Sequence, residues 1–537
     1  MSALPLPLLL LFHLAIQTSA WLLHQASSAS TQVEHRLSYI RHHDDKSLIR
    51  SAATTSIHEQ DITSLASADV DPVHQILRGR HKWLGGAYHS DDGCVYGIPS
   101  HSGHVICLSP ENGPGSSNDD YTINFLPLPS AIATPKKDKS HQFKWLRGII
   151  ANDTLFGIPA WFDGVLAVDL AAWRRWREEN SECTIVTDES SSKEIIRILP
   201  LPTIHGAEIG NDTVQSNRWK WHGAALNSNK TAIYCIPSNA DRVLKVDLIS
   251  MSTSYLSIPS LTTTAPLSLS NKWYGGILGD DNAIYGVPYA AGSVLRIDAN
   301  FDTISLLGEY GTNQYNWHGG ILANGSLYAF PAHAEAVLKI DTAVGLNDGE
   351  RLSTLPIQRA HYDLDGVARY KWLGGSMGAD GNVYGMPSDA SSILRIDTTT
   401  NEVTTFGCVE ATINDYSSND SVPEKNKWQM SSLRLISYKR YTKGGVLAKD
   451  GYIYAVPSNA RGILRIDSRP ELVTSIAAHD PARVSVIGNL PDTKDKWQGG
   501  FLVGNGSIYG IPENCDKVLE VKPTGSDGNN AAVVRLM

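Results

Sequence analysis

The sequence is poor in cysteine, has no strong excess of charge of either sign and carries no hydrophobic run long enough to span a bilayer after its N-terminal segment. Six cysteines in 537 residues are too few for a disulfide scaffold, and none has the CxxC spacing of a metal site. The 46 Lys and Arg face 55 Asp and Glu, for a net charge of -9. Because no long basic run occurs, nucleic acid is not expected as the main partner. No G-x-S-x-G, Walker, HExxH or dinucleotide motif occurs, so the corresponding enzyme classes have no motif support.

The N-terminus has the pattern of a targeting segment. Leu4–Ile16 is an apolar run of signal-peptide length, too short and too interrupted by proline for a membrane span, and Thr18–Ala20 offers small residues for cleavage. We therefore expect a signal peptide over residues 1–20, a disordered leader over 21–71, no stable membrane span, and a secreted or endomembrane-lumen protein. Trp21, just after the cleavage site, also resembles the bipartite presequences of algae with secondary plastids, so a plastid destination stays open.

Two kinds of modification fit an exported chain. Cys94 and Cys107 fall on neighbouring predicted strands, and they are the one pair that we would expect to form a disulfide in an oxidising compartment. Sequons for N-glycosylation suit a secreted glycoprotein. They occur at Asn152, Asn211, Asn229, Asn324, Asn419 and Asn505.

One sequence unit occurs eight times along the chain. It reads approximately K-W-x-G-G, a short turn, I-Y-G-I-P, then V-L-x-I-D. The repeated tryptophans are Trp83, Trp145, Trp221, Trp273, Trp317, Trp372, Trp428 and Trp497. The repeated prolines are Pro99, Pro159, Pro237, Pro288, Pro331, Pro387, Pro457 and Pro512. Ten places after the proline, six copies have an aspartate: Asp169, Asp247, Asp298, Asp341, Asp397 and Asp467.

Each unit predicts a blade of four strands. The three short β-rich runs of the motif are bounded by Gly, Asn, Asp or Pro, as three consecutive strands would be. A fourth strand is expected after the aspartate, at Thr122–Leu126, Ile195–Leu199, Ser254–Ile258, Thr303–Leu307, Val403–Phe406 and Val484–Ile487. Because one such sheet cannot bury both faces alone, the units predict an all-β protein, an eight-bladed β-propeller of four-stranded antiparallel blades over residues 72–537. A seven-bladed ring with an extra repeat is the alternative, and Val73–Leu77 is a candidate closing strand.

The repeat resembles β-propellers of the kelch, NHL, gluconolactonase and streptogramin-lyase kind. Their second and third strands carry similar I-Y-G-I-P and V-L-x-I-D patterns. The W-x-G-G before the first strand departs from the kelch pattern, and no W-D dipeptide ends the third strand. The resemblance therefore identifies the superfamily and leaves the subfamily open.

The seventh copy is longer than the others. Its Trp-to-Pro spacing is 29 residues instead of 14 to 16, because Met430–Lys443 separates Trp428-Gln429 from Gly444-Gly445. Removing this segment restores K-W-Q-G-G. Two hypotheses are open: a short intron retained in the gene model, or a real loop on one blade.

Residues repeated in every blade are expected to serve the fold. We interpret the Trp as a wedge between sheets, the Tyr of I-Y-G-I as core, and the Asp as a cap on the turn that follows. The Lys before the Trp is interpreted as a cover over the indole. An alternative is a ring of positive charge at the channel mouth that attracts an anionic ligand. The lysines are Lys82, Lys144, Lys220, Lys272, Lys371, Lys427 and Lys496, with Asn316 in the remaining copy.

Function is expected where the repeats differ. By resemblance to other propellers, K-W-x-G-G and the loop after the proline lie on one face, around the channel mouth. The candidate ligand-binding residues there are His222, His318, His333, Asp389, Asn459, Glu513 and Asn239. In gluconolactonase-like propellers, Glu, Asn and Asp at the mouth hold a divalent cation, and Asp389, Asn459 and Glu513 are the nearest match for Ca²⁺ or Mg²⁺ here.

The sequence predicts an exported propeller that binds a ligand or protein through its mouth face. The partner is a protein, a glycan or a small anionic ligand. The alternative is a divalent-metal-dependent hydrolase or lyase, with His318 or His333 as its base. Leu170–Asn180 has tryptophans at helical spacing and predicts a helix packed over its blade, with a partner-binding helix as the alternative.

Overall fold

The computed structural model describes ten segments of the chain. These are residues 71–111, 121–133, 142–203, 218–259, 269–358, 370–390, 392–407, 444–470, 483–523 and 531–537. Residues Asp71–Met537 form one compact unit. The predicted targeting segment and leader, Trp428 and Met430–Lys443 lie outside the described residues. Within the described segments, no helix has the length and apolar character needed to cross a membrane.

The described strands form eight antiparallel meanders of four strands, which we call blades 1 to 8 in chain order. Blade 1 has β1 (Trp83–His89), β2 (Cys94–Pro99), β3 (His104–Pro110) and β4 (Tyr121–Pro127). Blade 2 has β5 (Trp145–Ala151), β6 (Thr154–Pro159), β7 (Gly164–Asp169) and β8 (Ile196–Pro200). Blade 3 has β9 (Trp221–Leu226), β10 (Ala232–Pro237), β11 (Arg242–Asp247) and β12 (Ser252–Ser257). Blade 4 has β13 (Trp273–Leu278), β14 (Ala283–Pro288), β15 (Val294–Asp298) and β16 (Thr303–Leu307).

The second half of the chain repeats this order. Blade 5 has β17 (Trp317–Ala323), β18 (Ser326–Pro331), β19 (Ala336–Asp341) and β20 (Leu352–Gln358). Blade 6 has β21 (Trp372–Met377), β22 (Val383–Pro387), β23 (Ile393–Ile396) and β24 (Val403–Phe406). Blade 7 has β25 (Val446–Leu447), β26 (Tyr452–Ala455), β27 (Ile463–Asp467) and β28 (Val484–Ile487). Blade 8 has β29 (Trp497–Leu502), β30 (Ile508–Pro512), β31 (Leu519–Lys522) and β32 (Val533–Leu536).

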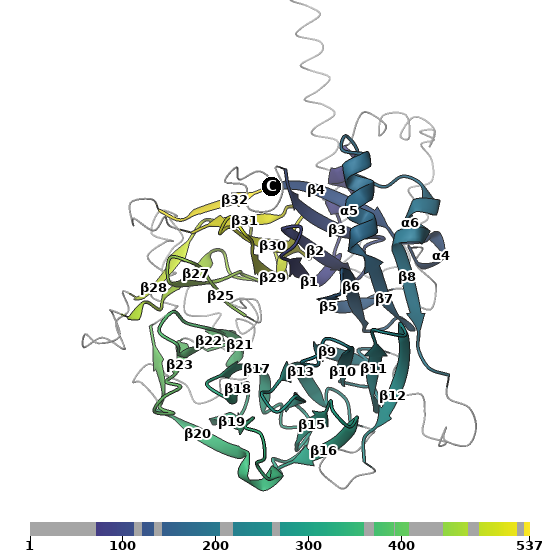
Figure 1. The fold of residues 1–537 in the computed structure, drawn as a ribbon. Helices are drawn as coiled ribbons and strands as arrows, with labels where there is room; N and C mark the ends of the chain where they lie inside the picture. Colours follow the sequence, from purple (N-terminus) through teal and green to yellow (C-terminus); the bar gives the residue numbers. More distant parts are fainter. Residues whose placement is uncertain are drawn as a thin grey trace, which may run out of the picture. The chain divides into compact units, whose positions relative to one another are not determined.

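The blades follow one another around a ring, as Figure 1 shows. The first strand of each blade contacts the first strand of the next, and β29 contacts β1. Blades 5 and 6 are also joined by parallel pairing between β20 and β24. This arrangement confirms the predicted all-β propeller of four-stranded antiparallel blades. All six predicted fourth strands are present.

Two expectations from the sequence were wrong. Val73–Leu77 is not a closing strand: Pro72–Leu77 is helix α3, and Asp71 Oδ1 accepts the Val73 N–H at 3.0 Å. An Asp cap followed by proline favours a helix start, and blade 8 obtains its fourth strand from β32. The predicted disulfide is also absent, because Cys94 and Cys107 are both free thiols. Cys107 lies opposite Tyr96 across the β2–β3 pair, so the two cysteines are not direct partners.

The repeated tryptophans hold each blade together, as predicted. In the seven copies that the structure describes, the indole Nε1 donates to a carbonyl at the start of the third strand of the same blade, at 2.7 to 2.9 Å. Each ring also packs against the neighbouring sheet: Trp145 of blade 2 lies in one apolar cluster with Tyr96 and Ile98 of blade 1. The tryptophan is therefore a wedge between blades.

The repeated Tyr and Asp also have the predicted roles. The tyrosine side chains, and Phe156 in blade 2, are fully buried. In five blades the aspartate Oδ1 accepts the backbone N–H two residues on, at 2.9 to 3.1 Å. In blade 2, Asp169 instead caps helix α5 (Leu170–Glu179) through the Ala172 N–H. Trp173 of α5 is fully buried and lies 5.5 Å from the Tyr96 ring, which confirms a helix packed on the blades.

Three short helical elements complete the described structure. Helix α4 covers Ser130–Ala133, and α6 covers Glu189–Ile195. A single 3₁₀ turn, η2, covers Asp348–Glu350 before β20. In Figure 1, α4, α5 and α6 gather at one side of the ring, beside blades 1 and 2.

Candidate functional site

The Trp and the Pro of each repeat lie at the same end of the blade. In register, Trp83 lies opposite Pro99 and Trp145 opposite Pro159, and the other described copies pair in the same way. The start of the first strand and the loop after the second strand therefore share one face, as predicted. We call this end of the blades the mouth face.

The repeated lysines of the mouth face connect adjacent blades. Lys82 Nζ donates to the carbonyls of Glu513 and Cys515 in blade 8, at 2.8 and 2.9 Å. Lys220 Nζ similarly reaches Phe162 O in the preceding blade at 2.9 Å. Burial lowers the pKa of Lys82 to about 8. Because these buried ammonium groups bind backbone carbonyls, their positions do not support an open ring of positive charge.

Asn239 and Asn459 also connect neighbouring blades. Asn239 Oδ1 accepts the N–H of Asn271 at 2.7 Å, and Asn459 Oδ1 accepts the N–H of Asp495 at 2.8 Å. Asn514, in the same loop position of blade 8, accepts the His81 N–H at 2.7 Å. All three donors lie two residues before a repeated Trp and have positive φ. The asparagines thus cap a left-handed residue in the next blade.

Aromatic side chains fill the mouth face of blades 3 to 5, which we call the closed sector. The Tyr274 ring lies 4.0 Å from His222, 4.5 Å from Tyr289 and 4.7 Å from His318. His318 Nδ1 is 2.9 Å from Leu373 O. The neighbouring His333 ring packs between two tyrosines of the same face, Tyr315 and Tyr370. The three predicted histidines therefore belong to one continuous aromatic layer.

The mouth face of blades 8, 1 and 2, which we call the open sector, contains a cavity. Here the residue after the repeated Trp is Gln498, Leu84 or Leu146 instead of an aromatic residue. The cavity has a volume of about 710 Å³. Its lining includes Phe143, Leu146, Arg147, Trp219, His81, Gln498 and Glu513, together with glycines of the repeats. The cavity also reaches His222 at the edge of the closed sector and Val446 of blade 7. We call it the mouth cavity.

Two of the predicted site residues, His222 and Glu513, line this cavity, and Glu513 is the charged one. Its side chain is buried, and its Oε1 lies 2.8 Å from His81 Nδ1. Its Oε2 accepts the Gln498 amide at 2.7 Å. The bond with Glu513 raises the pKa of His81. Both carboxylate oxygens are therefore already engaged by neighbours.

The three residues of the predicted metal-binding trio come from three successive blades, 6, 7 and 8. Glu513 uses both its oxygens as described, and the Asn459 oxygen holds the Asp495 N–H. Asp389, in blade 6, is half-buried, and its backbone N–H donates to Tyr370 O at 3.1 Å. The side chains of Glu513 and Asn459 are thus engaged within the protein, and a metal role for the trio stays a prediction.

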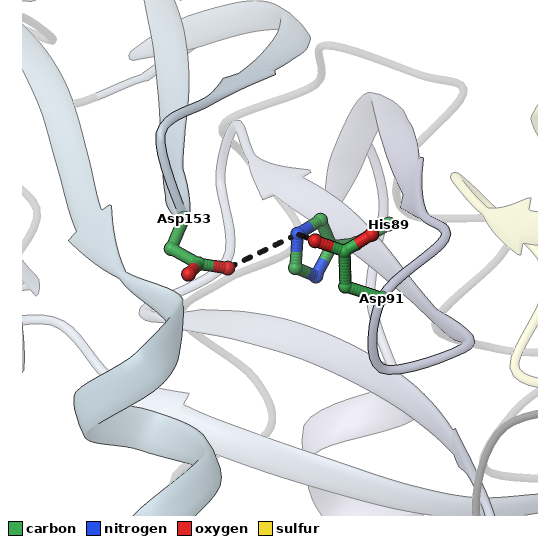
Figure 2. Close-up of side chains that lie close together, drawn as sticks. All are labelled: His89, Asp91 and Asp153. Atoms are coloured by element: carbon green, nitrogen blue, oxygen red, sulfur yellow. Dashed lines mark ion pairs between the residues drawn. The ribbon is translucent and has the colours of Figure 1, made fainter.

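A different group of metal-ligand types lies at the other end of blades 1 and 2. His89 Nε2 is 3.2 Å from Asp153 Oδ1 and 4.0 Å from Asp91 Oδ2 (Figure 2). Arg174 of α5 supplies positive charge at the same place, with Nη2 3.4 Å from Asp153 Oδ1. Arg174 therefore already provides a positive charge beside the acidic groups.

Sequence reasoning missed Arg147, which lines the mouth cavity. The signal was present: the other seven repeats have glycine at the corresponding place. Arg147 forms no hydrogen bond or ion pair with any residue that the structure describes. Burial lowers the pKa of Arg147, with no carboxylate near enough to oppose that effect.

No family model and no curated protein matches this chain. Among solved structures, a streptogramin B lyase matches with a TM-score of 0.40 and 13% identity, over 85% of this chain and 94% of that one. An inactive virginiamycin B lyase from Staphylococcus aureus, solved with quinupristin, matches with a TM-score of 0.38 and 13% identity, over 59% and 83%. A protein from Lactobacillus plantarum has a TM-score of 0.37 and 14% identity, over 60% and 89%. At these scores the matches carry no argument about the site. On its own strand order the chain is a β-propeller, and streptogramin B lyase is among the solved proteins that it resembles.

Proposed function

We propose that the protein is a binding module that takes a small ligand into the mouth cavity of the open sector. The observation that carries the proposal is the difference between the two sectors of one face. Repeated aromatic rings fill the closed sector, whereas smaller side chains leave about 710 Å³ in the open sector. That volume is within the range of small-molecule sites.

The lining supports a ligand with an apolar body. Phe143, Leu146 and Trp219 supply an apolar and aromatic wall, while His81, Gln498 and Glu513 add a few fixed polar groups. A largely apolar concave site with a small number of oriented polar groups is the usual composition of a ligand pocket. The alternative of a metal-dependent hydrolase or lyase has less support, since the oxygens of Glu513 and Asn459 are engaged within the protein.

The proposal is tested with a neutral apolar probe and a matched pair of variants. N-phenyl-1-naphthylamine is titrated by fluorescence into the wild type, Trp219→Ala and Tyr315→Ala. Both residues lie two places before a repeated Trp and have positive φ, but only Trp219 lines the mouth cavity. We expect saturable binding that weakens about tenfold in Trp219→Ala, as loss of an aromatic contact would cause, and stays unchanged in Tyr315→Ala. Equal weakening in both variants, or no saturable binding to the wild type, would refute the proposal.

We also propose that this binding module is exported. The support is the apolar run Leu4–Ile16 with small residues before Trp21, a pattern typical of cleaved signal peptides. N-terminal sequencing of the mature protein is expected to begin at Trp21. An intact Met1 in a protein recovered from the cytosol would contradict export, and a plastid-targeted mature protein would favour the bipartite presequence.

A further inference from the structure

Arg147 occupies a position at which the other copies of the repeat have glycine. It is the fourth residue of the motif K-W-x-G-G in blade 2, which reads K-W-L-R-G. The other copies have Gly85, Gly223, Gly275, Gly319, Gly374, Gly444 and Gly499 at this place. Because only blade 2 has an arginine at this position, the arginine cannot be needed by the fold that all the blades share. Its role must be specific to blade 2.

The backbone at this position is unfavourable for an arginine. Arg147 has φ of +63°, and Gly85 and Gly499 at the same place in adjoining blades 1 and 8 have φ of +86° and +77°. A side chain in this left-handed region is crowded by its own backbone, which is why glycine is preferred there. Strain of this kind persists where a site requires it. Gly85 of blade 1 leaves space for the Arg147 side chain because it has no Cβ. A Cβ at Gly85 would lie 3.3 Å from Arg147 Cα and 3.7 Å from its Cγ.

The charge of Arg147 is also not balanced within the described protein. Buried guanidinium groups elsewhere have partners: Arg351 Nη1 lies 3.4 Å from Asp281 Oδ2, and Arg483 Nη2 donates to Asp467 O at 2.7 Å. Arg147 is half-buried and has no such bond within the described residues, so its guanidinium is left to the cavity. The unfavourable backbone and the unpartnered charge therefore fall on one side chain that lines the mouth cavity.

We propose that Arg147 is the anion receptor of the mouth cavity and that the ligand is a small organic anion. Its carboxylate, phosphate or sulfonate group binds the Arg147 guanidinium, and its apolar or aromatic body lies against Phe143, Leu146 and Trp219. This inference rests on the proposed function of the mouth cavity and adds the chemical class of the ligand.

The geometry of the charged groups favours an anion at the blade 2 wall. A planar guanidinium presents paired N–H donors that match two oxygens of a carboxylate or phosphate. Two carboxylates also line the cavity, Glu513 and Asp495. Glu513 is held by His81 and Gln498, Asp495 Oδ1 accepts the Ser458 hydroxyl at 3.2 Å, and neither forms an ion pair with Arg147. The cavity therefore leaves its arginine, and not its glutamate, open to a ligand.

Two probes that differ by one charged group test the inference. 8-Anilinonaphthalene-1-sulfonate is N-phenyl-1-naphthylamine with an added sulfonate, so the pair isolates the anion. Both are titrated into the full chain as wild type, Arg147→Gly and Arg218→Ala. Arg147→Gly restores the repeat sequence, so the variant is expected to fold. Arg218→Ala removes an exposed cation of the same face, whose guanidinium lies 4.7 Å from the Trp161 ring centre.

We expect the sulfonate probe to bind Arg147→Gly at least tenfold more weakly than the wild type, as loss of a charge-assisted bond would cause. The neutral probe should bind both proteins alike, and Arg218→Ala should bind both probes as the wild type does. Equal sulfonate affinity in wild type and Arg147→Gly would overturn the inference while leaving the proposed function standing. Equal losses of sulfonate affinity in Arg147→Gly and Arg218→Ala would also overturn it, since that result reflects general surface charge.

A third probe separates failure of the inference from failure of the proposed function. Inorganic phosphate carries the anion without an apolar body. If neither aromatic probe binds the wild type, the apolar-pocket proposal fails. A rise in the melting temperature of the wild type with phosphate, absent in Arg147→Gly, would still support the anion receptor. No difference between the two proteins would overturn it.

Discussion

The closed and open sectors of the mouth face are built from the same repeat and end in different surfaces. In the closed sector, Tyr274 and His318 follow the repeated Trp and pack ring against ring. In the open sector, Leu84 and Leu146 take the same positions and leave the mouth cavity between blades. From this difference we infer that the variable residue after the Trp helps to set how far the mouth is filled, while the repeated residues hold the blades in both sectors.

The largest expected effect concerns the shared framework. Trp145→Ala and Trp317→Ala should each lower the free energy of unfolding by about 3 to 5 kcal/mol, because each removes a buried ring together with its Nε1 bond. Urea unfolding of the two variants measures this loss. Similar losses in the two sectors would show that the repeated tryptophan stabilises both sectors to the same extent. A large loss in only one sector would mean that the repeated tryptophan does not serve both alike.

A reciprocal exchange of the variable residue should move the cavity. Tyr274→Leu removes three ring contacts and is expected to cost about 1 to 2 kcal/mol of unfolding free energy. Leu146→Tyr should place a ring in the mouth cavity and weaken binding of N-phenyl-1-naphthylamine. Unfolding by urea and the probe titration give the two readouts. If Leu146→Tyr binds the probe as the wild type does, the residue after the Trp does not control the cavity.

The charge pair of the open sector should make stability depend on pH. Glu513 raises the pKa of His81, so the protonated ring favours the folded state. This contribution is complete below the ordinary value of 6.5 and is lost as the pH rises through the raised folded value. Relative to Glu513→Gln, the melting temperature of the wild type should therefore be highest near pH 6 and fall toward pH 9, by about 2 °C. A difference between the two proteins that does not change with pH would exclude this pair as its source.

The strands and the core of the blades could be predicted from the sequence because a residue that recurs in every repeat has the same physical role in every blade. The Trp, Pro, Tyr and Asp positions recur at fixed spacing, so each could be assigned to one place in every blade. The α3 segment was mistaken for a strand because its apolar residues Val73, Ile76 and Leu77 carry no repeat signal, and its Asp71-Pro72 start was overlooked. The register places Cys107 opposite Tyr96, so Cys94 is its diagonal neighbour; both sulfurs lie beside Arg177 Nη1, at 3.3 and 3.4 Å, and remain free thiols.

The site was harder to predict, because loop position does not reveal which atoms are already bound. Asn239 and Asn459 are polar and lie on the mouth face as expected, yet both cap a backbone N–H of the next blade. Glu513 and His222 both line the mouth cavity, and the Glu513 partners His81 and Gln498 come from two different repeats. Arg147 was visible as a departure from glycine. The positive φ of Arg147 and its lack of a hydrogen-bond partner among the described residues are visible only in the structure.

The smallest expected effect is the most direct test of the central claim that Arg147 is retained for a ligand and not for the fold. The measurement is the melting temperature of wild type and Arg147→Gly, each without and with 8-anilinonaphthalene-1-sulfonate. Without the probe, Arg147→Gly should be more stable by about 1 kcal/mol, because glycine relieves the strain at positive φ. The probe should then raise the melting temperature of the wild type more than that of the variant. An Arg147→Gly protein that melts below the wild type without the probe, with equal shifts when it is added, would show that Arg147 serves the fold and would contradict the account.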